Sequence, residues 1–487
     1  MTLIDARQFD NAVYRDGSWV PGRGAPIDVT EPATGNVLGR IGGAAPEDVH
    51  DAAQTAAVAQ RAWAALPHPE RAAVMHRAAD LWEKHAAEIM DWNTREVGAI
   101  GPMAGFAVHV ASAECREAGA LPSAPRGELL ASEKPRLAFA SRVPVGVVGV
   151  ISPFNVPIIL GTRAVAPALA LGNAVILKPD PRTAVTGGVA MVRIFEEAGL
   201  PAGLLQMLPG GADVGEAMVT DPEIQVIAFT GSTKAGRSVG ELAGRHLKRA
   251  HLELGGNSAF LVLDDADVDQ AVNLATWGAF LHQGQICMSI GRHLVHESLY
   301  AEYVEKLAAK ADSMVVGDPA AGQVHLGPVI DASQRDRILD LIQRSVEMGA
   351  ELRAGGTADG LFVRPTVLAS PPLDAPAYCE EVFGPVASVV PFADDDEAVK
   401  LAGAGDYGLS LGIVTRQPMR GLALSDRIPS GIVHINDQTV DDEANSPFGG
   451  VGSSGTGSRH GGAAANIDAF TETRWITMQA EPGAYPL

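Results

Sequence analysis

Four short apolar runs that alternate with helix-like stretches constrain the fold of this 487-residue chain more than any other feature. Continuous runs of Val, Ile and Leu are typical of strands that are buried on both faces of a parallel sheet. The four apolar runs occupy residues 145–151, 174–177, 204–208 and 225–229. Helical stretches follow the last three runs, at residues 183–198, 213–219 and 234–243. This alternation predicts an α/β fold with a doubly wound parallel sheet, in which ligands bind beyond the carboxyl ends of the strands.

The regions on either side of this sheet also have predictable elements. Two helices are expected upstream at residues 46–66 and 69–97, and the first begins with a proline and two acids, a favourable helix start. A second α/β region is expected at about 254–441, with helices near residues 268–281, 299–314 and 333–348. Residues 470–478 alternate like an edge strand, which must be covered or paired, and a second subunit is one candidate for that role.

Composition excludes several classes of protein. The formal net charge of −21 disfavours a nucleic-acid partner, because nucleic-acid binders need a basic surface. The three cysteines, Cys115, Cys287 and Cys379, form no disulfide framework, which favours a reducing cytoplasm. The first residues lack the apolar core of a signal peptide, and no run of apolar residues is long enough to span a bilayer, so no membrane association is expected.

Cys287 and Glu253 are the candidates for chemistry. Cys287 lies in a loop-like segment with Gly284 and polar neighbours, whereas Cys115 and Cys379 lack such a setting and are interpreted as structural. Taken alone, a cysteine is more often a buried structural thiol. Glu253 ends a β-like run and precedes two glycines, and burial would raise the pKa of its carboxyl group toward that of a useful base. Together they indicate covalent catalysis by a thiol, followed by hydrolysis.

Other polar residues lie at the predicted strand ends. Asn155 is either an ordinary turn residue or an amide donor to a developing oxyanion. Residues 230–236 join a strand to a helix, where Gly231 and Ser232 would let a phosphate approach backbone N–H groups, although an ordinary helix cap explains them equally well. Lys178 ends another strand and could bond ribose hydroxyls, but an isolated lysine is normally just solvated.

A last cluster, at residues 380–385, combines two acids with an aromatic residue and Gly-Pro. It is either a strand-ending turn or a site where Glu381 accepts from sugar hydroxyls and Phe383 packs on a flat ring. No His-x-x-x-His or Cys-x-x-Cys pattern occurs, so no catalytic metal is expected.

Taken together, these motifs resemble the NAD(P)-dependent aldehyde dehydrogenase superfamily over nearly the whole chain. The matching segments are Pro153-Phe154-Asn155, Leu177-Lys178-Pro179, Phe229-Thr230-Gly231-Ser232, Leu252-Glu253-Leu254-Gly255-Gly256, Gly284-Gln285-Ile286-Cys287, Glu381-Val382-Phe383-Gly384-Pro385 and Pro447-Phe448-Gly449-Gly450. The resemblance implies that Cys287 is the nucleophile, Asn155 the oxyanion donor and Glu253 the base. It further implies that the coenzyme is held by Lys178, Gly231, Ser232, Glu381, Phe383, Ser152, Phe154 and Leu254.

Segments 178–183, 434–440 and 442–450 are similar to the benzaldehyde dehydrogenase branch, which implies an aromatic aldehyde as substrate and NAD as coenzyme. Pro181 stands where many NAD-preferring members carry a Glu, which together with Arg182 leaves NADP as an alternative. Phe154 replaces the commoner Trp. Arg459-His460 stands where many relatives carry an acid, which argues against a proton relay from there.

The resemblance also implies a division of the chain. Residues 1–126 and 144–253 would form the dinucleotide-binding domain, and residues 254–443 the catalytic domain that carries Cys287. Residues 127–143 and 465–487 would form a β oligomerisation arm, which implies a homodimer or homotetramer.

Three other functions compete with this interpretation. A dehydrogenase for aliphatic aldehydes or semialdehydes, or one that transfers the acyl group to CoA, would share the nucleophile. Glu253 argues against the CoA-acylating type, because thiolysis needs no base to activate water. A cysteine hydrolase would need a paired histidine, which the sequence does not indicate. A purely structural protein would not need the set of Cys287, Glu253 and Asn155.

Overall fold

The first sheet contains the four predicted strands in a mainly parallel arrangement. The computed structural model describes residues 2–483 and 485. The strand order is β11-β10-β7-β8-β9-β1-β2, and β1 alone runs opposite to the other strands, so it pairs antiparallel with both β9 and β2. The strands are β1 (Ala12–Arg15), β2 (Ser18–Pro21), β7 (Val147–Ile151), β8 (Ala174–Lys178), β9 (Leu205–Met207), β10 (Ile224–Thr230) and β11 (Arg249–Glu253). The predicted parallel sheet is therefore confirmed.

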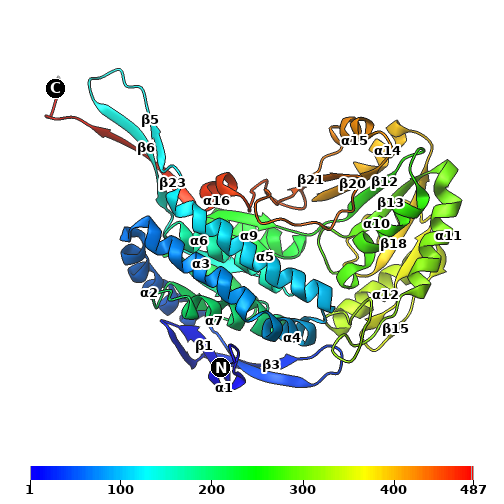
Figure 1. Ribbon diagram of the computed structural model, residues 1–487, viewed down its shortest axis with the longest axis horizontal. Coiled ribbons are helices and arrows are strands. Elements are labelled where there is room, and N and C mark those ends of the chain that lie inside the picture. The colour runs from blue at the N-terminus through cyan, green and yellow to red at the C-terminus, as the bar shows by residue number, and fades with distance from the viewer. Residues whose placement is uncertain (1, 484, 486–487) are drawn as a thin grey trace.

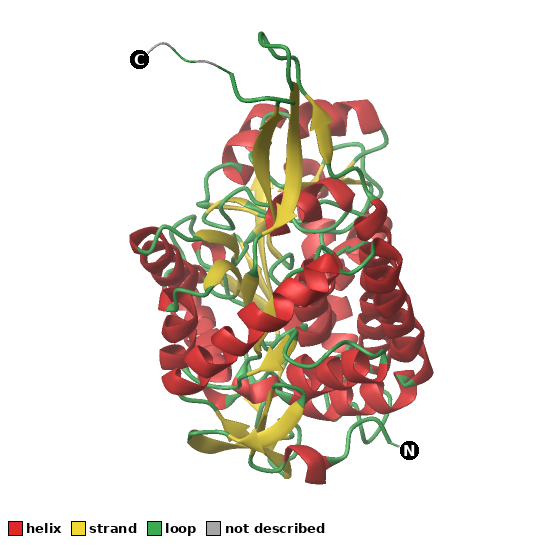
Figure 2. Cartoon of the chain, turned by 90° about the vertical axis from the view of Figure 1, so that its left-hand side faces the viewer, coloured by secondary structure: helices red, strands yellow, loops and turns green. Residues whose placement is uncertain are grey.

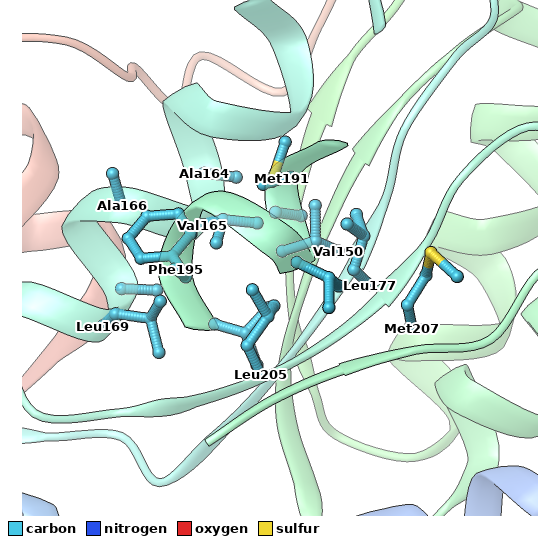
Figure 3. Packing of buried hydrophobic residues seen from close by; sticks show 14 of the residues in the cluster. Val150, Ala164, Val165, Ala166, Leu169, Leu177, Met191, Phe195, Leu205 and Met207 are labelled. Carbon is cyan, nitrogen blue, oxygen red and sulfur yellow. The ribbon is translucent and has the colours of Figure 1, made fainter. Parts of the chain in front are cut away.

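Helices cover both faces of this sheet (Figure 1). One layer contains α2 (Pro46–Ala65), α8 (Ala212–Thr220) and α9 (Thr233–Arg245), and the other α3 (His68–Lys84), α5 (Gly101–Ala120), α6 (Pro157–Ala170) and α7 (Ala190–Glu197). In the second layer, Phe195 of α7 packs beside Val165 and Leu169 of α6 and over Leu205 of β9 (Figure 3). These side chains are buried almost completely, so the carboxyl ends of the strands are held on a rigid base.

Two expectations for the helices need correction. The single helix expected at residues 69–97 is two helices, α3 and α4 (Ala86–Val97), with His85 between them. The chain bends there, and Lys84 and His85 both bind the Glu197 carboxylate. Helix α6 was missed altogether, although Pro157 lies in its first turn, where a proline is well tolerated.

The second sheet repeats this architecture, with strand order β14-β17-β18-β13-β12-β20-β21. Its strands are β12 (Ser258–Val262), β13 (Ile290–His296), β14 (Glu351–Ala354), β17 (Thr366–Ala369), β18 (Val386–Phe392), β20 (Ser410–Val414) and β21 (Ile432–Ile435). The three predicted helices are confirmed as α10 (Val268–Phe280), α11 (Glu297–Ser313) and α12 (Ala332–Glu347). The edge strand β14 pairs antiparallel with β17, whereas the inner strands are parallel.

A three-stranded sheet projects from the body of the molecule (Figures 1 and 2). Strand β23 (Thr471–Met478), the predicted edge strand, pairs along its length with β6 (Leu137–Pro144) of the same chain, and β5 (Gly127–Leu129) flanks β6. At the base, the Asn173 amide donates to the carbonyl of Phe470 and accepts from the N–H of Gly146, which fastens β23 to the start of β7. One edge of β23 has no neighbouring strand within the described chain. The proposed domain boundaries stay predictions.

The remaining elements connect these sheets. They are α1 (Ala6–Phe9), β3 (Gly24–Thr30), β4 (Val37–Gly43), β15 (Ala358–Asp359), β16 (Phe362–Val363), α13 (Pro376–Cys379), α14 (Asp395–Ala402), β19 (Tyr407–Gly408), α15 (Pro418–Ser425), β22 (Val451–Gly452) and α16 (Ala463–Phe470). Short helical turns lie at Leu121–Ser123, Pro181–Thr183, Val185–Val189 and Leu281–Gly284. No helix in the described part of the chain has the length and apolarity needed to cross a membrane.

Candidate active site

The residues selected from the sequence gather where the strands of the first sheet end. Ser152 and Asn155 follow β7, Lys178 is the last residue of β8, and Glu253 is the last residue of β11. The turn between β10 and α9 is fastened to this edge, because the N–H of Gly231 donates to the carbonyl of Glu253 at 3.0 Å. All these strands are parallel, so their carboxyl ends meet at one edge of the sheet.

Cys287 reaches this edge from the second sheet because of a left-handed turn after α10. Three consecutive residues, His282, Gln283 and Gly284, have φ values of 54°, 58° and 67°. Non-glycine residues rarely adopt this conformation, so other contacts must hold it. The His282 ring nitrogen bonds the carbonyl of Asn155 at 2.7 Å, and the Gln283 amide donates to Pro328 and Gly98 and accepts from the N–H of Gly327. The loop that carries the thiol is thus hydrogen-bonded to the segments after β7, after α4 and before α12.

Close backbone packing fixes the position of Cys287 further. A Cβ atom at Gly256 would lie 2.2 Å from the carbonyl oxygen of Cys287, so only glycine allows this approach. A Cβ atom at Gly284 would lie equally close to the carbonyl oxygen of Gly384. Close backbone packing therefore explains why glycine stands at Gly256 and Gly284, in two of the motifs noted in the sequence.

Cys287 and Asn155 line one cavity of about 860 Å³. The Asn155 amide nitrogen donates to the carbonyl of Gln285 at 2.8 Å, which orients the side chain and leaves its second N–H for another acceptor. Most of the wall is apolar or aromatic, including Met103, Phe106, Ile159, Leu160, Trp277, Met288, Val440 and Phe448. The sequence prediction that Cys287 and Asn155 share a site therefore has direct geometric support.

Glu253 is buried, with 4% of its surface exposed, and its carboxylate oxygens have no hydrogen-bond partner among the described residues. Burial raises the pKa of this carboxyl group well above its ordinary value, whereas the guanidinium groups of Arg459 and Arg163 and the backbone N–H of Gly450 act in the opposite direction. A carboxyl group with a raised pKa accepts a proton readily, as a general base must.

The surroundings of the Cys287 thiol also oppose its ionisation. Burial raises its pKa, and the carboxylates of Glu381 and Glu253 raise the pKa further, while Arg163 lowers it. The other two cysteines lie elsewhere: Cys115 is fully buried in α5, and Cys379 is exposed at the end of α13. Neither of these two cysteines lines the cavity that contains Cys287.

Most residues expected to hold a coenzyme fall into three groups: the charged Lys178 and Glu381, the turn at Gly231 and Ser232, and two aromatic residues. Lys178 is mostly buried, its pKa is lowered by burial, and it has no ion pair within the described chain. Ser232 caps α9 by accepting from the N–H of Ala235, while the N–H of Gly231 is already used by Glu253. Glu381 accepts from the N–H of Gly256 at 2.8 Å.

The third group is aromatic. Phe154 and Phe383 meet edge to face, with ring centroids 5.8 Å apart, and Phe383 has a positive φ of 53°. The guanidinium of Arg182 lies 4.1 Å from the centroid of the Phe154 ring and is hydrogen-bonded to the carboxylates of Asp180 and Asp331. Arg182 therefore supports Phe154 rather than standing free beside the predicted ribose site.

Sequence reasoning missed one charged residue near the reactive pair, Cys287 and Glu253. Arg163 of α6 is buried and bound by Glu114 and Asp442, and it lies over the ring of Phe448. No periodicity reveals a buried arginine, since most arginines are solvated.

No cluster of three or more His, Cys, Asp or Glu side chains with metal-binding geometry occurs in the described residues.

Comparison with known proteins identifies the family. The model of the aldehyde dehydrogenase family matches residues 19–476. The chain belongs to this family. It is 62% identical over the whole length of both chains to a vanillin dehydrogenase of Amycolatopsis sp.. It is also 48% identical to a benzaldehyde dehydrogenase [NAD(+)] of Pseudomonas putida, over 96% of each chain.

The solved structures agree with this assignment. A salicylaldehyde dehydrogenase from Pseudomonas putida G7, complexed with salicylaldehyde, superposes with a TM-score of 0.94 at 35% identity, covering 98% of this chain and 99% of that one. The predicted superfamily, its benzaldehyde dehydrogenase branch and the α/β fold are thereby confirmed.

The environment of Cys287 predicts how its reactivity depends on pH when no coenzyme is bound. In a Cys379→Ser variant, which lacks the exposed thiol, we expect alkylation by iodoacetamide to accelerate continuously above pH 9, because the pKa of Cys287 is raised. Glu381→Gln removes one of the two carboxylates and shifts the profile to lower pH. Stopped-flow or mass-spectrometric rates measure both, and a plateau below pH 8 would contradict the assignment.

Proposed function

We propose that this enzyme oxidises an aromatic aldehyde, benzaldehyde or a ring-substituted relative, to the carboxylic acid with NAD+. The observation that carries the proposal is the cavity in which Cys287 and Asn155 stand among mostly apolar and aromatic walls. A flat ring fits such walls, because aromatic and aliphatic side chains supply most of the binding energy of small ligands. Relatives named for vanillin and benzaldehyde support the substrate class.

In the proposed mechanism, the thiolate of Cys287 adds to the aldehyde carbon. The Asn155 amide and the backbone N–H of Cys287 stabilise the oxyanion, and removal of one such donor typically costs about 10² to 10³ in rate. A nicotinamide coenzyme held by Lys178, Glu381 and the turn at Gly231 and Ser232 would supply the hydride acceptor, and loss of hydride from the tetrahedral adduct would leave a thioester on Cys287. Glu253 then takes a proton from water, the hydroxyl attacks the thioester carbon, and the carbon–sulfur bond breaks.

The donor set at the strand ends suits a dinucleotide. Lys178 offers a buried ammonium group without an ion-pair partner in the described structure, and Glu381 offers a carboxylate for sugar hydroxyls. Ser152, Leu254 and the turn at Gly231 and Ser232 stand beside them on the same edge. Arg182 is occupied by Asp180 and Asp331, so it is not available to a 2′-phosphate, and this favours NAD over NADP.

The alternatives weighed from the sequence are less well supported. A CoA-acylating enzyme has no use for the buried Glu253. A cysteine hydrolase needs a histidine that activates the thiol, and the nearest candidate, His282, is hydrogen-bonded to the carbonyl of Asn155 and its pKa is lowered to about 4 by burial. An aliphatic substrate would not use the aromatic walls of the cavity.

The substrate proposal predicts the outcome of an aldehyde panel. With NAD+, we expect kcat/KM for benzaldehyde, vanillin and salicylaldehyde to exceed that for propanal and succinic semialdehyde by at least tenfold, or about 1.4 kcal/mol. NADP+ in parallel should be the poorer coenzyme, and added CoA should not change the rate. Preference for the aliphatic aldehydes would refute the aromatic assignment while leaving the family intact.

We further infer that the projecting sheet joins copies of this chain into a homodimer or homotetramer in the cytoplasm. The unpaired edge of β23 and the exposed side chains of Leu129, Trp475 and Met478 support the inference, because exposed apolar edges otherwise invite aggregation. Family resemblance of residues 127–143 and 465–487 to an oligomerisation arm supports it as well.

A charge placed on this edge should weaken the assembly. We expect the wild-type chain to sediment as a dimer or tetramer and Trp475→Glu to sediment as smaller species, because the indole is 66% exposed on the arm. Met419→Glu, at an equally exposed position on α15, is the matched control and should leave the assembly unchanged. A wild-type monomer at micromolar concentration would contradict the inference.

A further inference from the structure

Arg163 is the most deeply buried cation near the reactive pair. Its side chain comes from α6 and is 4% exposed. The Nε atom donates to a Glu114 carboxylate oxygen at 3.0 Å, and Nη2 donates to both carboxylate oxygens of Asp442. The guanidinium lies 4.6 Å from the centroid of the Phe448 ring. These contacts hold the side chain in one place from two different segments, α5 and the connection between β21 and β22.

One nitrogen of this guanidinium remains without a partner. Nη1 is buried and forms no hydrogen bond with the described residues, and the same is true of both carboxylate oxygens of Glu253. Buried polar atoms normally find partners, because leaving one unsatisfied costs about 1–3 kcal/mol. An unpaired cation and an unpaired carboxylate in the same region therefore call for a functional explanation.

A small chamber brings these two groups together. Its volume, about 10 Å³, is that of a single water-sized space, and its wall includes Arg163, Glu253 and His460. Leu160 and Phe448 line both this chamber and the large cavity that contains Cys287. The two cavities thus share part of their apolar lining, which keeps the local dielectric low and electrostatic effects strong.

We propose that Arg163 is a positioning residue for the hydrolytic half of the reaction: its charge holds the Glu253 carboxylate, in ionised form, where it accepts a proton from the attacking water. This inference rests on the proposed function, because it assumes a thioester on Cys287. During hydrolysis the water oxygen bonds to the thioester carbon, its proton passes to Glu253, and the thiolate leaves. Arg163 keeps its own proton throughout.

The surrounding charges are consistent with this role. Burial opposes ionisation of Glu253, and the cations that act against it are Arg459, with the larger effect, and Arg163. Arg459 is engaged with the carbonyls of Gly450 and Ser458, and His460 stays neutral because burial lowers its pKa well below the ordinary value. The groups that face Glu253 or Arg163 from the packed elements are Arg459, His460, Cys287, Glu114 and Asp442.

The test separates the charge of Arg163 from its packing. Arg163→Gln alone would leave Glu114 buried and unpaired, which can prevent folding. The informative pair is therefore Glu114→Gln, which keeps the guanidinium, and Arg163→Gln/Glu114→Gln, which removes it. Arg163→Lys, which keeps the charge, is the conservative variant, and circular dichroism with thermal melting verifies that each protein is folded.

The readouts are the pH profile of kcat and the pre-steady-state burst of NADH, with an aldehyde that the wild-type enzyme oxidises. In the double variant we expect a full burst, a kcat about tenfold lower at pH 7, and a profile shifted upward by about one pH unit, with recovery at high pH. Glu114→Gln and Arg163→Lys should keep the wild-type profile.

Three results would overturn the inference. The first is a double variant whose pH profile matches that of Glu114→Gln. The second is a loss of rate that is equal at every pH, and the third is a loss of the burst itself, since either would mean that Arg163 acts only on structure or on the first half-reaction. If the double variant does not fold, the two single variants decide. A wild-type pH profile of kcat in Glu114→Gln combined with a lowered kcat in Arg163→Lys would contradict the proposal, because Arg163→Lys keeps the positive charge. Failure of the wild-type enzyme to oxidise any aromatic aldehyde would instead reject the proposed function.

Discussion

The left-handed turn at His282, Gln283 and Gly284 is the constraint on which the site depends. It directs the segment after α10 away from the second sheet and toward the carboxyl edge of the first, where Asn155 and Glu253 already stand. Two of its three residues carry side chains, so the conformation is unfavourable by itself and is maintained by hydrogen bonds to Asn155, Gly98, Gly327 and Pro328. These hydrogen bonds fix the position of the Cys287 thiol.

Burial gives that thiol and its neighbouring carboxyl group their chemical character. In the described structure, the pKa values of Cys287, Glu253 and Glu381 are all raised by loss of solvent. These groups therefore ionise less readily than they would in water, which protects a reactive thiol from unwanted partners. Arg459 and Arg163 oppose this effect at Glu253, and Arg163 opposes it at Cys287. The site therefore combines apolar walls that suit an aromatic ring with a small number of buried charges.

The strands of the first sheet and the polar residues at their ends could be predicted from the sequence, because both depend on local patterns. Apolar runs that end in Gly, Pro or a polar residue identified the strand ends, and Asn155, Lys178 and Glu253 were selected on that basis. Gly256 and Gly284 were noticed only as parts of motifs, yet each allows a backbone approach that a Cβ atom would block.

What could not be predicted depends on contacts between distant segments. The positive φ values of His282 and Gln283 have no local signature, and the two prolines near α6 hid the helix that carries Arg163. Arg163 itself resembles any solvated arginine until Glu114, Asp442 and Phe448, from two other parts of the chain, are seen around it. Likewise, Arg182 was considered as a contact for a coenzyme phosphate. In the structure it is hydrogen-bonded to Asp180 and Asp331 and packs against the ring of Phe154.

The central claim, that Cys287 is acylated by the substrate and released by Glu253, is tested most directly by trapping the thioester. A Glu253→Gln variant is mixed with NAD+ and benzaldehyde and analysed by intact-protein and peptide mass spectrometry, with Cys287→Ala as the control. The account predicts one benzoyl group per chain, on the peptide that contains Cys287, and none in the control. An unmodified Cys287 during turnover, or acylation of Cys379 or Cys115 in its place, would contradict it.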